Sequence, residues 1–177
     1  MKIEQFFLKS VGEWNSMRSG HSLAFQEFDE IRSKIKIIPA HTDDSRVIKL
    51  FKDNAIATNK EKKAFLISWE TKSEWGDENE KENSSGESIL IPLETSEKEG
   101  KLIRSVGYTE AIAIMSLYKI LDDGTLIISS KYNHMYTEER IWFVSNNVRS
   151  RSSVTRALES SAILQTSYAS EIRIIKK

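Results

Sequence analysis

Residues 31–37 read Ile-Arg-Ser-Lys-Ile-Lys-Ile, with a basic residue at every second position. Because successive side chains of a β-strand point to opposite faces, this strict alternation predicts a strand with one buried face. The period of two begins at Ser16, continues through Leu23 and Phe25, and returns at 65–69. We therefore expect a mainly β protein.

Short apolar runs separated by turn residues fill the rest of the chain. Further strands are expected at 89–93, 102–108, 111–121, 140–144, 149–155 and 167–175. Asp123-Gly124, between Leu121 and Leu126, is a typical tight hairpin. Many short strands and few helices predict one antiparallel barrel or sandwich.

Two helices are expected within this β pattern. A short one should cover 3–9 before Gly12 stops it, and a second should follow an N-cap at 42–44 and run through 47–54. The stretch 76–87 is charged and rich in Asn, Ser and Gly, which predicts a flexible loop. No repeat or linker divides the chain, so 1–177 is expected to form a single domain.

The composition excludes several classes of function. Lysine plus arginine equals aspartate plus glutamate at 26 each, so no net field attracts nucleic acid or an anionic membrane. No stretch approaches the roughly 18 apolar residues of a membrane span, and the N-terminal segment does not resemble a signal peptide. The absence of cysteine excludes disulfides, thiolate metal sites and a thiol-bound intermediate on this chain, and suits a reducing cytosol.

Motifs of the common enzyme classes are missing. The sequence has no glycine-rich phosphate loop and no nucleophile elbow. Its three histidines, His21, His41 and His134, lie far apart, so we expect no metal site.

Gly12-Glu13-Trp14 resembles the G-x-W motif at the first strand of lipocalin-type barrels. In that motif the glycine permits the turn and the tryptophan closes one barrel end. We therefore expect Trp14 to be a core residue rather than a ligand contact.

The resemblance becomes specific in three blocks. These are Phe6, Phe7, Ser10, Gly12, Trp14, Arg18 and His21; then Trp69 and Trp75 before an acidic loop; then 139–143 with 147–153. Together they resemble the CpcS/CpeS family of S-type phycobiliprotein lyases over most of the chain. Asn146 is a departure, since many members have proline there, and it should change the turn more than the chemistry.

The resemblance implies a lipocalin-like barrel that acts as a lyase. It would bind a phycobilin and attach it, by a thioether at the vinyl-side carbon of ring A, to a cysteine of a phycobiliprotein subunit. Overall likeness favours phycoerythrobilin over phycocyanobilin, and the bilin is a substrate, so no cofactor is implied. Family members are often dimers, which leaves a homodimer open, and the implied location is a cyanobacterial-type cytosol.

Specific side chains match the chemistry of a bilin. Arg149 and Arg151 are two residues apart, so on a strand both point to one face, where two guanidinium groups suit two propionates. Arg18 is a third candidate for binding. The family block places Glu139 at the pyrrole nitrogens, where it would hold the cationic tetrapyrrole and handle the proton as the thiol adds. Glu139 and Arg149 are the expected catalytic residues.

Other candidates carry a structural interpretation beside the functional one. Trp69 and Trp75 offer flat surfaces for stacking on a bilin, although Trp69 could equally be barrel core. Only one of Glu138 and Glu139 can point inward, and paired arginines on a strand are often a solvated face. We expect His21 to be a polar strand residue rather than an acid or base.

The register of one hairpin tests this hypothesis. If 145–147 form a three-residue loop, Phe143 pairs with Arg149, and Glu139 shares a face with both arginines. A two-residue loop would instead put Glu139 on the opposite face.

Two other functions stay open, a bilin carrier that transfers nothing and a lipocalin-like binder of another hydrophobic anion. Transfer of pigment to an apo-subunit separates them from a lyase. Arg149→Ala and Glu139→Ala are expected to weaken binding or transfer and to leave the barrel folded.

Overall fold

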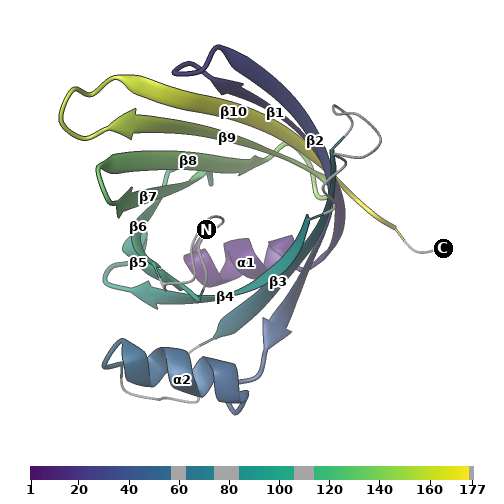
Figure 1. The fold of residues 1–177 in the computed structure, drawn as a ribbon. Coiled ribbons are helices and arrows are strands. Elements are labelled where there is room, and N and C mark those ends of the chain that lie inside the picture. Colours follow the sequence, from purple (N-terminus) through teal and green to yellow (C-terminus); the bar gives the residue numbers. More distant parts are fainter. Residues whose placement is uncertain (57–62, 74–83, 106–113, 176–177) are drawn as a thin grey trace.

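The computed structural model describes residues 1–56, 63–73, 84–105 and 114–175. Within these ranges the elements are α1 (Ile3–Ser10), β1 (Gly12–Ser22), β2 (Glu27–Ala40), α2 (Ser45–Asp53), β3 (Ala64–Ser73), β4 (Ser84–Glu94), β5 (Glu99–Arg104), β6 (Ile114–Ile120), β7 (Leu126–Tyr132), β8 (Met135–Phe143), β9 (Val148–Ala157) and β10 (Ile163–Arg173). Each strand pairs antiparallel with its neighbours in sequence, and β1 also pairs with β10 (Figure 1). The sheet is therefore a closed barrel, which confirms the predicted mainly β lipocalin-like barrel and not the sandwich.

The alternating stretch 31–37 lies in β2, where its basic residues are exposed and Ile37 is buried, as predicted. The expectation was wrong for Leu23 and Phe25, which are exposed in the turn between β1 and β2. Since β1 and β2 are paired up to the last residue of β1, the chain has to reverse there and cannot extend the strand. The first strand also begins at Gly12, earlier than the pattern at Ser16 indicated.

Helix α1 lies inside the barrel, close to its predicted position (Figure 1). Ile3, Phe6, Phe7 and Ser10 recur at the spacing of one helix face, and all four are buried. The helix packs against inward side chains of the strands, among them Phe65, whose ring stacks on Phe7 at a centroid distance of 5.0 Å. Full burial of each such aromatic side chain contributes about 2–3 kcal/mol.

The C-terminal end of α1 is fixed by β1 and β10. Trp14 is fully buried, and its indole N–H donates to the carbonyl of Ser10 at 2.9 Å, which confirms its expected core role. The Arg173 guanidinium lies over the Trp14 ring, 4.2 Å from its centroid, and donates to the carbonyls of Lys9, at 2.6 Å, and Val11. These donors satisfy carbonyls that the helix itself leaves unpaired.

Helix α2 packs on the outside of the barrel (Figure 1). Asp44 is its N-cap, within the predicted 42–44, and accepts from the Arg46 N–H at 2.9 Å. Hydrogen bonds from the side chain and backbone of Arg46 lower the pKa of Asp44 to about 2. The apolar face of the helix covers outward side chains of β3, β4 and β5, so the barrel buries residues on both sides of this part of the sheet.

Part of the predicted loop 76–87 is strand. Residues 84–87 belong to β4 and pair with 68–71 of β3, because the ladder supplies their backbone hydrogen bonds despite a polar sequence. The remaining residues of that loop, and the predicted strand positions 106–108 and 111–113, lie outside the described residues. In the described part of the chain, no helix is long and apolar enough to cross a membrane.

Candidate functional site

The hairpin of β8 and β9 has the odd register that the binding hypothesis requires. Phe143 pairs with Arg149, and Glu139 pairs with Ser153. The Val144 N–H donates to the Val148 carbonyl at 2.9 Å, so residues 145–147 form the loop as expected. Because side chains alternate, Glu139, Arg149 and Arg151 share the inner face of the barrel.

Five charged side chains meet on this inner face and form what we call the charged cluster. Its members are Arg104 of β5, Glu139 of β8, Arg149 and Arg151 of β9, and Glu171 of β10. Three guanidinium groups and two carboxylates leave the cluster with one excess positive charge. All five are largely buried, so their mutual interactions are only weakly screened by water.

One half of the charged cluster is a sealed ion pair. Arg149 and Glu171 are direct cross-strand partners, and the Arg149 Nε donates to Glu171. Their side chains are only 2% and 1% exposed. The Arg149 guanidinium also lies over the Trp14 ring, 4.6 Å from its centroid. Arg149 is thus held by β10 and by the residue that anchors α1.

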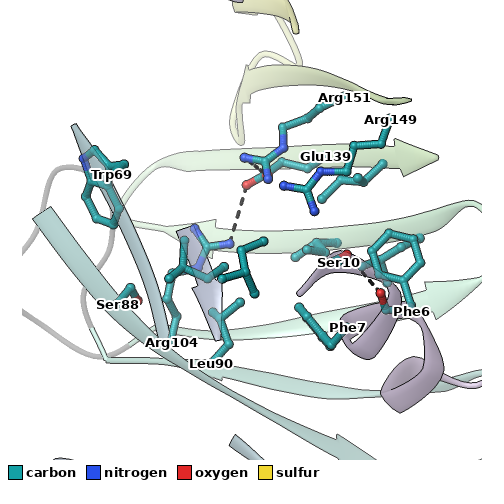
Figure 2. A pocket seen from close by; sticks show the side chains of 15 residues that line it. Phe6, Phe7, Ser10, Trp69, Ser88, Leu90, Arg104, Glu139, Arg149 and Arg151 are labelled. Atoms are coloured by element: carbon teal, nitrogen blue, oxygen red, sulfur yellow. Dashed lines mark hydrogen bonds and ion pairs between the residues drawn. The ribbon is translucent and has the colours of Figure 1, made fainter. Parts of the chain in front are cut away.

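The other half surrounds Glu139. Arg104 Nη2 lies 3.7 Å from one carboxylate oxygen of Glu139, and Arg151 Nη1 lies 3.9 Å from the other. Both distances are longer than a hydrogen bond, so these are ion pairs between charges in near contact. Figure 2 shows Arg104 approaching from the strand opposite Glu139. Glu139 is 12% exposed, and Arg104 and Arg151 are 14% and 19% exposed, which leaves this half accessible from the pocket.

A pocket adjoins the charged cluster, with about 560 Å³ of empty space when the part open to solvent is included. Most of the lining is apolar and comes from α1 and the strands around it: Phe6, Phe7, Ile37, Ile67, Leu90, Leu126, Ile128 and Ile141. The polar groups are few and convergent, an arrangement that orients a largely apolar ligand by its charges.

Trp69 lines the same pocket from β3 and is half-buried. Its cross-strand neighbour is Gly86, and a Cβ atom there would lie 2.4 Å from the indole Cζ2. Glycine at 86 therefore leaves room for the indole to lie across β4. The position allows contact with a ligand, and stacking on a bilin stays a prediction.

Two further sequence-derived candidates, Arg18 and His21, are not brought into the pocket. Arg18 occupies an inner-face position of β1, but it pairs with Asp29 at 3.5 Å and does not line the pocket. His21 is exposed, with its ring 5.0 Å from that of Phe28, in keeping with a polar strand residue. Trp75 lies outside the described residues.

Two rows of inner-face residues frame the site on β6 to β9. We call Ile120, Leu126 and Ile141 the apolar row; they are paired across neighbouring strands and buried against α1. We call Ser116, Ser130, Thr137 and Thr155, on β6 to β9, the hydroxyl row; it lies two rows farther on, and its neighbouring members are joined by strand pairing or by side-chain hydrogen bonds. Glu139 lies in the row between them. Ser116 and Ser130 are hydrogen-bonded at 2.7 Å, and Thr137 and Thr155 at 3.0 Å.

Two members of the charged cluster were not among the sequence-derived candidates. Glu171 could have been found, because the strand at 167–175 places it on one face with the small residue Ala169. Arg104 carries no such signal, since its strand meets Glu139 only across the closed barrel. No group of three or more His, Cys, Asp or Glu residues suited to a metal ion occurs among the residues that the structure describes.

Known proteins match the sequence of this chain over most of its length. The family described as "CpeS-like protein" matches residues 2–174. Chromophore lyase CpcS/CpeS 3 of Trichodesmium erythraeum is 38% identical over 173 residues, covering 98% of this chain and 99% of that protein. The putative phycoerythrobilin lyase CpeS of Microchaete diplosiphon is 36% identical over 151 residues, covering 84% and 66%.

A solved structure agrees with this relationship. The S-type phycobiliprotein lyase CPES of Guillardia theta has a TM-score of 0.85 and 31% identity to this chain, covering 100% of this chain and 95% of its own. Fold and pocket define a lipocalin-like barrel with a charged interior site. Within that class, the chain belongs to the CpeS-like protein family.

Proposed function

We propose that this protein is a bilin lyase that binds a linear tetrapyrrole non-covalently and attaches it to a cysteine of a phycobiliprotein subunit. The observation that carries the proposal is the position of Glu139, between two arginines at the wall of a largely apolar pocket. A bilin combines a long apolar face, pyrrole nitrogens and two propionates, and this pocket offers a partner for each. The names of the relatives, chromophore lyases, support the same reaction class.

The proposed step adds a thiol to the bilin. The cysteine sulfur of the acceptor bonds to the exocyclic carbon of ring A, the double bond of that substituent is consumed, and the thiol proton ends on the tetrapyrrole. No oxidant or reductant is needed. Since the chain has no cysteine, the acceptor supplies the nucleophile, while Glu139 holds the pyrrole nitrogens and handles the proton.

We favour phycoerythrobilin as the substrate and the cytosol as the location. The Microchaete relative is named a putative phycoerythrobilin lyase, which supports this choice over phycocyanobilin. An apo-subunit of a phycobiliprotein is the proposed acceptor, and the bilin is consumed as substrate rather than retained as cofactor.

The test mixes the protein with phycoerythrobilin and an apo-subunit and follows pigment that stays on the subunit in acid. We expect covalent transfer by the wild type and a loss of about 10²–10⁴-fold in rate for Glu139→Gln, as for a general acid–base group. Glu138→Gln is the matched control, because Glu138 is the adjacent residue on the outer face and pairs with Arg140 at 2.9 Å. Binding without transfer would favour a carrier, and no visible spectral shift would favour a binder of another anion.

A homodimer through the outer face of β1, β10 and β9 is also proposed. The outward positions at 15–19, 166–172 and 148–154 carry no Asp, Glu, Lys or Arg, and Met17, Tyr168 and Ile172 are 52%, 48% and 57% exposed. Two copies can face each other there without like-charge contact. We expect Ile172→Glu to shift the mass measured by light scattering from dimer to monomer, and a monomeric wild type would contradict the proposal.

A further inference from the structure

Arg149 and Arg151, which the sequence pairs as two equal propionate ligands, are unequal in the structure. The Arg149 side chain is 2% exposed and bound to Glu171, whereas Arg151 is 19% exposed. If Arg149 turned to a ligand, Glu171 would lose the partner to which it is hydrogen-bonded, in a place where it is 1% exposed. Arg151 Nε, at 4.0 Å, would remain near Glu171, but losing the hydrogen-bonded partner of a buried carboxylate is still unfavourable.

Arg104 and Arg149 both line the pocket, but Arg104 is the more exposed of the two and is not bound to Glu171 in the same way. Arg104 lines the pocket from the opposite side of the barrel and is 14% exposed (Figure 2). Its distance to Glu139, 3.7 Å, nearly equals that of Arg151, 3.9 Å. Glu139 therefore lies between two accessible guanidinium groups on different strands.

Charge balance gives an independent argument. The Arg149–Glu171 pair is neutral by itself, so Arg104, Arg151 and Glu139 carry the excess positive charge. A bilin with a protonated core brings two carboxylates and one cation. Its carboxylates would neutralise Arg104 and Arg151, and its core would neutralise Glu139, so every charge in the site gains a partner. If Arg149 rather than Arg104 bound a propionate, that propionate would compete with Glu171 for the Arg149 guanidinium.

We propose that Arg104 and Arg151 bind the two propionates of the bilin, one from each side of Glu139, and that Arg149 is a positioning residue. Arg149 holds Glu171 and lies over Trp14, and through them it keeps β9 and β10 in register beside the pocket. This inference rests on the proposed function, because it assigns groups of the same ligand.

The experiment compares phycoerythrobilin with its dimethyl ester, which lacks both carboxylates, by absorption titration. We expect the wild type to prefer the free acid, and Arg104→Gln to weaken its binding by about 10- to 100-fold, the usual range for a charge-assisted hydrogen bond. Binding of the ester by this variant should stay within about threefold of the wild type, since only the acid loses a partner. Arg104→Gln with Arg151→Gln should bind acid and ester equally.

Arg149→Gln should behave differently. Any loss of affinity should be the same for acid and ester and should accompany a lower melting temperature. Arg149→Lys, which keeps the charge, should partly restore the affinity and the melting temperature. Arg140→Gln is the matched control, because Arg140 is exposed on the outer face of β8 and pairs with Glu138.

The outcomes are distinguishable. An unchanged preference for the free acid in Arg104→Gln, or a lost preference in Arg149→Gln, overturns the assignment of the arginines. A wild type that binds acid and ester equally overturns propionate recognition while bilin binding stands. A wild type that binds neither overturns the proposed function itself.

Discussion

The apolar row on β6, β7 and β8 and the hydroxyl row on β6 to β9 lie two rows apart on the same part of the barrel, yet they differ in chemistry and in burial. Residues of the apolar row are buried against α1, whereas Ser130, Thr137 and Thr155 of the hydroxyl row are only half-buried. The apolar row contributes to stability by excluding water. The hydroxyl row satisfies its own polar groups in pairs across neighbouring strands, so water or a ligand can approach without leaving them unpaired.

This contrast shows that one part of the barrel interior, at the apolar row, stabilises the fold, while another part, at the hydroxyl row, is open to a ligand. Glu139 lies between the two rows, where the surroundings change from apolar to polar. Arg149 and Glu171 lie beyond the apolar row, toward α1, and there even charged residues are sealed. The same residue types are therefore sealed beside α1 and become more exposed from the level of Arg151, which pairs with Ile141, onward.

The largest expected effect comes from removing the carboxylate of the buried Arg149–Glu171 ion pair. Glu171→Gln keeps the volume but leaves Arg149 as a buried charge without its carboxylate, so we expect a loss of about 3–5 kcal/mol in the free energy of unfolding. Urea unfolding followed by circular dichroism measures it. Glu138→Gln, at an exposed pair, should cost under about 1 kcal/mol. Equal losses in the free energy of unfolding for the two variants would show that water screens the Arg149–Glu171 pair as it does an exposed pair.

A matched pair of substitutions tests the two rows directly. Leu126→Ala leaves a cavity in the apolar row and should cost about 2–5 kcal/mol. Thr137→Val removes one hydroxyl from the hydroxyl row and should cost under about 1.5 kcal/mol, because its partner Thr155 is half-buried and can bond to water instead. Comparable losses in urea unfolding would contradict the division of the interior.

The smallest expected effect concerns Tyr118, which lies in the row of Glu139. Its hydroxyl is buried, and among the described residues it has no hydrogen-bond partner, so Tyr118→Phe should change stability at neutral pH by under about 1 kcal/mol. Burial, with the charge of Glu94, raises the pKa of Tyr118 to about 12.

The Tyr118→Phe variant should also differ from the wild type in how its stability changes at alkaline pH. Above a pH of about 10 the unfolded chain releases the tyrosine proton and the folded one keeps it, so stability falls as the pH rises. Tyr118→Phe should therefore become more stable than the wild type near pH 11, relative to their difference at neutral pH. If the melting temperatures of the variant and the wild type changed equally between neutral pH and pH 11, the burial of the phenol would be contradicted.

The part of the site that could be predicted from sequence is local. Alternation along β8 and β9, together with the loop at 145–147, places Glu139 and the two arginines on one face, and the register confirms it. Trp14 and both helices were likewise indicated by short-range spacing. These features depend on residues within one turn or one hairpin of each other.

The remaining features of the site depend on how the barrel closes and on how deeply each side chain is buried. The alternation of residues along a strand encodes neither. Arg104 meets Glu139 across the interior, so its place follows from the curvature of the whole barrel. Arg149 and Arg151 share a face, but only Arg149 is sealed, beside Trp14 and Glu171. A period of two cannot distinguish these two degrees of burial. For this reason the expectation that Arg149→Ala leaves the barrel folded needs revision: loss of the buried pair should destabilise it by about 3–5 kcal/mol.

The clamp of Arg173 on the end of α1 has a consequence for biosynthesis. The two partners, Arg173 and Lys9, are separated by 164 residues, and the seam between β1 and β10 spans a similar distance. A ribosome makes the helix first and the clamp much later, at about 5–20 residues per second. For many seconds Phe6 and Phe7 therefore have no completed barrel to enter, so the nascent chain exposes its most apolar helix until β10 emerges.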